Sequence, residues 1–75
     1  MTKLPRDLSG RKVMRALARA GFYVRRRRGG SHVILRRDNP FAQVVVPDHK
    51  RLDTGTLDSI LEAAGLSNDE FRKLL

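Results

Sequence analysis

The chain has 75 residues, enough for one small domain spanning residues 1–75, and its lack of cysteine excludes disulfide bonds and thiolate metal ligands. The net charge of +8 is uneven, because residues 1–37 carry a net +11 and residues 38–75 a net −3. This basic first half predicts a polyanionic partner, most simply nucleic acid, although a solvated surface without a ligand is the alternative. No apolar stretch approaches the ~18 residues of a membrane span or forms a signal peptide, so we expect a cytoplasmic protein with no membrane partner.

The first predicted element is a helix that begins after Ser9 and ends at Gly21. Ser9 is a suitable N-cap, and apolar residues from Val13 to Leu17 recur at helical spacing. Basic residues occupy the rest of the helix surface. A glycine after the last turn ends a helix well because it adopts positive φ without strain. Residues 1–8 are expected to form an arm ahead of this helix.

The spacing of apolar residues then changes to alternation, which is typical of strands. The glycine pair at 29–30 predicts a two-residue hairpin turn, because both central positions of a type I′ turn need positive φ. Asp-Asn-Pro at 38–40 predicts a second turn. The three predicted strands cover about residues 22–28, 31–37 and 42–46.

The hairpin turn fixes which side chains share a face, since alternation has a period of two. With the corner at residues 29–30, Arg27 lies opposite His32. The mostly apolar face, expected to lie on the core, carries Val24, Arg26, Val33 and Leu35. The cationic face carries Tyr23, Arg25, Arg27, His32, Ile34 and Arg36.

Two further helices are predicted after the third strand. Asp53 or Thr54 can cap the first, which ends at Gly65, and Ser67 with Glu70 forms an S-x-x-E capping box at the start of the second. The order helix, strand, strand, strand, helix, short helix predicts an α+β fold with a three-stranded antiparallel sheet. Both longer helices can cover one face of that sheet, which leaves the cationic face open.

His32 is the best candidate for chemistry on this open face. An imidazole titrates near ~6.5 and exchanges protons at cellular pH, while arginines bind and neutralise phosphate. A ribonuclease without a metal must deprotonate a ribose 2′-OH, stabilise charge growing at phosphorus and protonate the leaving 5′-oxygen. His32 is one good candidate for proton transfer and the arginines can stabilise the charge, but the sequence offers no second proton-transfer candidate of this kind. The alternative is a histidine that only makes structural hydrogen bonds.

The remaining polar residues allow more than one interpretation. His49, the only other histidine, is either a catalytic partner or an ordinary loop residue. Ser31 either orients a phosphate or completes the turn, and Tyr23 can stack on a base. No metal-ligand motif or nucleotide-binding loop is present, so neither a metal nor a cofactor is predicted. The residues predicted to bind RNA or phosphate are Tyr23, Arg25, Arg27, Ser31 and Arg36.

Four segments together resemble one known family: LSGRKVMRALARAGF, GGSHVILRR, VVVPDHK and TGTLDSILEAAGLSNDEF. They are similar to HicA-type toxins, also called YcfA-like proteins, of type II toxin–antitoxin systems. The resemblance implies a double-stranded-RNA-binding-domain-like fold, translation-independent cleavage of single-stranded mRNA and neutralisation by a HicB-type antitoxin. In that family the histidine of the G-S-H motif carries the activity, and here it is His32. The run of four arginines before the glycines exceeds what the family leads us to expect.

Two other functions fit the same residues. The chain could be a non-enzymatic RNA-binding module with the same fold. Its basic surface could also exist mainly to dock an acidic protein, and a HicB-type antitoxin is one such partner. Strand scission distinguishes an enzyme from a binding module, whose affinity falls with salt but which leaves RNA intact.

Overall fold

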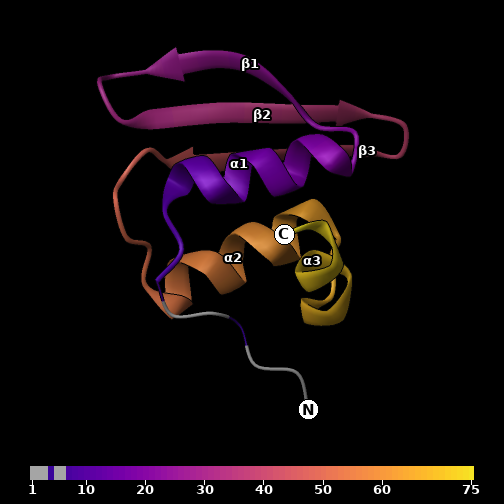
Figure 1. Cartoon of the computed structure of the whole chain (residues 1–75). Coiled ribbons are helices and arrows are strands. Elements are labelled where there is room, and N and C mark those ends of the chain that lie inside the picture. Colours follow the sequence, from indigo (N-terminus) through magenta and orange to yellow (C-terminus); the bar gives the residue numbers. More distant parts are fainter. Residues whose placement is uncertain (1–3, 5–6) are drawn as a thin grey trace.

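The computed structural model describes residues 4 and 7–75 and has the predicted α+β architecture (Figure 1). Part of the predicted arm over residues 1–8 lies outside the described residues, but Leu8 is buried in the core, so the chain joins the fold before the first helix. None of the described helices has the length and hydropathy needed to cross a bilayer. In chain order the elements are α1 (Gly10–Arg19), β1 (Tyr23–Arg28), β2 (His32–Asp38), β3 (Phe41–Pro47), α2 (Thr54–Ala64) and α3 (Asn68–Leu74).

The helices begin at the predicted caps. The side chains of Ser9, Asp53 and Ser67 each accept a hydrogen bond from the backbone N–H three residues further on. Glu70 accepts a hydrogen bond from the Ser67 N–H at 2.9 Å, which completes the capping box. At the end of α2, Gly65 adopts a positive φ of 73°. Local sequence therefore sets the helix boundaries, and each side-chain cap is typically worth about 1 kcal/mol.

The strands form one antiparallel sheet in the order β1-β2-β3, and the helices lie on one side of it (Figure 1). The side chains of Val33 and Leu35 in β2 are buried in the core between sheet and helices. Their neighbours His32, Ile34 and Arg36 therefore point to the opposite side, which we call the open face. The largest side chains of this core that are almost fully buried are Phe71, Leu17, Leu35, Leu57, Val13, Val33, Val44 and Val46.

The predicted two-residue turn at Gly29-Gly30 is wrong. Arg28 pairs with His32, so three residues, 29–31, connect β1 to β2. A type I′ turn needs positive φ at both central positions, but only Gly29 has one, at 56°. A three-residue loop needs positive φ at fewer positions, so the Gly-Gly-Ser segment at residues 29–31 can form such a loop.

The predicted register is correct at one end of the hairpin and wrong at the other. Tyr23 and Val24 have their predicted partners, but Arg25 is an extra residue in a β-bulge. Beyond the bulge every pairing shifts by one position. Arg27 therefore lies opposite Val33 on the helix side. The arginines opposite residues of the open face are Arg26, paired with Ile34, and Arg28, paired with His32.

Candidate nucleic-acid site

His32 is exposed on the open face, as predicted, at the end of the sheet next to the hairpin tip. Its position follows from its neighbour Val33, whose side chain is fully buried in the core and forces the preceding residue to the other face. The residues directly across from His32 are Arg28 on β1 and Pro47 on β3. The imidazole therefore lies between a guanidinium and the last residue of β3.

Two shallow hollows meet at His32. One has a volume of 430 Å³ and is lined by Arg28, Gly29, His32 and Val45. The other has a volume of 320 Å³ and continues from His32 and Val45 to α2, where Thr56 and Ser59 supply hydroxyl groups. One side of the imidazole is therefore cationic, and the other offers neutral hydrogen-bonding groups.

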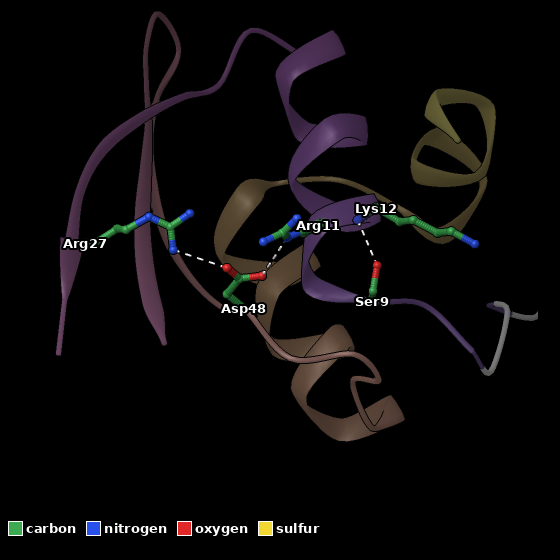
Figure 2. Close-up of polar contacts among 5 residues, drawn as sticks. All are labelled: Ser9, Arg11, Lys12, Arg27 and Asp48. Carbon is green, nitrogen blue, oxygen red and sulfur yellow. Dashed lines mark hydrogen bonds and ion pairs between the residues drawn. The ribbon is translucent and has the colours of Figure 1, made fainter. Parts of the chain in front are cut away.

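Arg27 does not share this site, contrary to the prediction that it lies opposite His32. Its Nη1 donates to Asp48 Oδ2 at 3.2 Å, while Arg11 Nε approaches Asp48 Oδ1 at 3.5 Å (Figure 2). The hydrogen bond from Arg27 holds the pKa of the Asp48 carboxyl below its ordinary value, and the positive charge of Arg11 acts in the same direction. Asp48 therefore joins β1 to α1 on the helix side of the sheet.

The backbone of Asp48 also contacts the loop that carries the histidine. Its N–H donates to the carbonyl oxygen of Ser31 at 2.6 Å. Ser31 is half-buried and completes the turn immediately before His32. The hairpin tip is thus attached to the body of the domain both by this bond and by the Arg27–Asp48 pair.

Tyr23 and Arg36 lie on the open face but toward its opposite end. The Tyr23 hydroxyl donates to Asp38 at 3.0 Å, and Arg36 Nε lies 3.0 Å from the same carboxylate. The Arg36 Nε contact is an ion pair and not a hydrogen bond, because the N–H has no aligned acceptor. The guanidinium also lies over the Phe41 ring, 5.2 Å from its centre. Arg36 is four residues from His32 along β2, roughly 13 Å, so these groups are outside the two hollows.

Arg26 and Arg28, which were not predicted to bind phosphate, are brought to the open face by the strand pairing. Arg28 lines the hollow beside His32. Arg26 lies opposite Ile34, whose exposed fraction is only 4%. Arg25, which was expected on the cationic face, is the bulge residue. The Gly-Gly-Ser sequence is compatible with a two-residue and with a three-residue loop, so it does not select this arrangement by itself.

His49 is exposed and lies near the start of α1, away from the two hollows at His32. Its carbonyl oxygen accepts a hydrogen bond from the Gly10 N–H at 2.9 Å. The imidazole lines a separate hollow of 460 Å³ with Ser9, Arg11, Asp48 and Lys50. The structure therefore does not bring the two histidines together. Over residues 4 and 7–75, no three side chains of the metal-binding types gather closely enough to hold a metal ion.

Comparison with known proteins identifies the family. Residues 10–66 match the family model described as the HicA toxin of bacterial toxin–antitoxin systems. The matched segment runs from the first residue of α1 to just beyond α2 and includes His32 and the whole sheet. No curated protein matches the chain significantly. Because the family match covers well over half of the sequence, the chain belongs to the HicA family and is a toxin of a toxin–antitoxin system.

Proposed function

We propose that this toxin is an endoribonuclease, an mRNA interferase that cleaves single-stranded mRNA without a metal ion and uses His32 for proton transfer. The observation that carries the proposal is the exposed imidazole directly across from Arg28, in a hollow on the open face. Membership of the HicA family supports the toxin role. The basic first half of the chain supports a polyanionic substrate.

The proposed reaction needs a proton acceptor, a proton donor for the leaving oxygen and a source of positive charge. His32 accepts the proton of a ribose 2′-OH, and the 2′-oxygen then bonds to the adjacent phosphorus. The bond from phosphorus to the 5′-oxygen breaks, and that oxygen gains a proton from the imidazolium or from water. The products are a 2′,3′-cyclic phosphate and a 5′-hydroxyl. In this proposal Arg28, the residue across from His32, neutralises the charge that develops on the phosphoryl oxygens.

The predicted phosphate ligands differ in whether a carboxylate already pairs with the guanidinium. Arg27 and Arg36 each have a carboxylate partner, which competes with phosphate for the guanidinium. Arg28 has no carboxylate within ion-pair distance among the residues that the structure describes, and it lies beside His32. We therefore propose Arg28 as the main phosphate ligand. The roles predicted for Tyr23, Arg25, Arg27, Ser31 and Arg36 stay predictions.

We further propose a HicB-type antitoxin as the protein partner and the cytoplasm as the site of action. Family membership supports the first proposal, because a toxin of this kind acts opposite a neutralising protein. The proposed mRNA substrate supports the second. An open reading frame for a HicB-like protein beside the toxin gene, and co-purification of the two products, would test the partnership.

Replacement of His32 tests the catalytic proposal. His32→Ala should lower the rate of cleavage of a long single-stranded transcript by about 10²- to 10⁴-fold, the usual contribution of a positioned acid or base. Because the side chain is exposed, circular dichroism and the midpoint of thermal unfolding should stay unchanged. His49→Ala is the matched control and should cleave like the parent. A folded His32→Ala variant with parental activity would disprove the assignment.

Two further measurements distinguish the mechanism from its alternatives. EDTA should leave the cleavage rate unchanged, whereas loss of activity on chelation would indicate a metal-dependent reaction. A substrate with 2′-deoxyribose at the cleaved position should resist cleavage, because it lacks the attacking oxygen. If the parent protein binds the transcript tightly and never cuts it, the protein is a binding module and the enzymatic proposal fails.

A further inference from the structure

We propose that helix α1 carries a second RNA-binding surface, the α1 stripe, formed by Lys12, Arg15 and Arg19. This inference rests on the proposed RNA substrate and extends the contact surface beyond the hairpin. It concerns binding and not chemistry. RNA held at His32 would continue across the start of α1 and along this helix.

The α1 stripe is charged without compensation from its own helix. All three side chains are exposed, and the ten residues of α1 contain no acidic residue. Arg15 and Arg19 are four positions apart, so their like charges face each other on one side of the helix and destabilise it. Neither Lys12 nor Arg15 has a carboxylate within ion-pair distance in the part of the chain that the structure describes. A bound polyanion would relieve this repulsion.

The three cations gather around one hollow. Lys12, Arg15 and Arg19 line a depression of 360 Å³ together with Leu8 and Leu75. Arg19 is held in place by the hydrogen bond from its Nη1 to the Leu74 carbonyl oxygen, 2.7 Å long. The remaining N–H groups of its guanidinium are available to a ligand. Cationic side chains beside apolar ones suit a sugar–phosphate backbone with an adjacent base.

The α1 stripe is connected to the His32 end of the sheet by short contacts. Arg11, in the first turn of α1, reaches Asp48 at 3.5 Å, and the Asp48 N–H binds the carbonyl oxygen of Ser31, the residue before His32. Arg11 points toward Arg27 and Asp48, and Lys12 points to the other side of the same turn (Figure 2). Arg11 and Arg19 are eight residues apart, about 12 Å along the helix axis.

An extended polyanion explains these observations better than a compact acidic ligand. Arg11 and Arg27 share Asp48, so the uncompensated cations lie in two regions, Arg28 at the hairpin and the α1 stripe, and a ligand long enough to reach both gains contacts at each. The substrate proposed for His32 is such a ligand. An acidic protein is the other occupant that this charge would accept, and the experiment below distinguishes the two.

Binding measurements with a catalytically inactive protein test the inference. In the His32→Ala chain, the further changes Arg15→Gln and Arg19→Gln should raise the Kd for a long single-stranded RNA by about tenfold or more. The slope of log K against log salt should decrease by about 1.4, because each lost phosphate contact on single-stranded RNA is worth about 0.7. The matched control removes two charges elsewhere, Arg51→Gln with Lys73→Gln, and should change both values much less.

Cleavage kinetics with an otherwise unmodified chain provide a second readout. The Arg15→Gln, Arg19→Gln variant should raise KM for the long transcript with little change in kcat, since it removes binding away from the reacting atoms. This effect on KM should decrease as the RNA is shortened to a few nucleotides. Circular dichroism of both double variants checks that the helix content is retained.

The outcomes separate this inference from the proposed function. If the α1 variant and its control bind RNA equally well, the α1 stripe is not an RNA surface, whether or not the parent cleaves RNA. An acidic protein would then be the remaining occupant. If the parent never cleaves RNA but its binding depends on Arg15 and Arg19, the enzymatic proposal fails and the α1 stripe is supported.

Discussion

Arg28 is the guanidinium that strand pairing places directly across from His32. We expect Arg28→Gln to lower kcat/KM for RNA cleavage by about 10- to 100-fold, because loss of a charge-assisted hydrogen bond costs about 1.5–3 kcal/mol. Arg36→Gln is the comparison. It removes the same charge from the same face, but its guanidinium is bound to Asp38 and lies over the Phe41 ring. Equal losses in the two variants would contradict the assignment of Arg28.

The exposure of His32 could be predicted, but its arginine neighbour could not. Val33, Ile34 and Leu35 are all apolar, but two of the three, Val33 and Leu35, share the face that packs on the core, and this places His32 on the other face. The identity of Arg28 as the opposite residue depends on the loop and on a bulge at Arg25, neither of which alters the pattern of β2. The pairing of Asp48 with Arg27 could not be predicted either, because the two residues come together only when the loop after β3 folds against the hairpin.

At the scale of elements, the boundaries of helices and strands follow from short-range signals. The capping box of Ser67 and Glu70 involves residues three apart, so it can be recognised in the sequence. The register of β1 has no such signal. Its side chains are all exposed, and four successive positions are arginine. Without a buried apolar residue on one face, alternation cannot select one pairing over another.

The junction between α1 and the end of β3 depends on Gly10. A Cβ at this position would overlap the Pro47 carbonyl oxygen and lie 3.0 Å from its carbon. Gly10→Ala should therefore lower the free energy of unfolding by about 1–3 kcal/mol, a typical cost of overpacking. Gly55→Ala is the matched control, since among the residues that the structure describes its Cβ would approach Asp53 Oδ1 at an ordinary contact distance of 3.6 Å.

Urea denaturation of the two glycine variants measures this difference. The control substitution is in α2, where alanine favours the helix by up to about 1 kcal/mol relative to glycine. We therefore expect changes of opposite sign. If Gly10→Ala is as stable as the parent, then α1 can move away from β3 at no cost and the close approach is not required.

At the scale of the whole molecule, three carboxylates couple stability to pH. The pKa of each is lowered by hydrogen bonds: Asp48 by Arg27, Asp53 by the Thr56 backbone and Glu70 by the Ser67 backbone. In the unfolded chain these groups return to ordinary values of about 4, so the unfolded state takes up protons first as the pH falls. Their stabilisation is fully present above those values.

Stability should therefore decrease as the pH is lowered from about 5 through the lowered pKa values of these groups. The free energy of unfolding, measured in urea between pH 6 and pH 2, checks this expectation. Asp53→Asn should make the dependence shallower, because asparagine can still cap α2 but does not titrate. A curve that is flat over this range in the parent would contradict the contribution of the three carboxylates.

The tip of the hairpin has a practical consequence. Apart from Gly30 itself and its two chain neighbours, no heavy atom of the described residues lies within 4 Å of a side-chain carbon built there, and the φ of Gly30 is not positive, so other residues fit at this position. The native chain contains no thiol. Gly30→Cys would thus create a single attachment point for a fluorophore, two residues from His32. Such a label would allow the arrival of a ligand to be followed in real time by its emission.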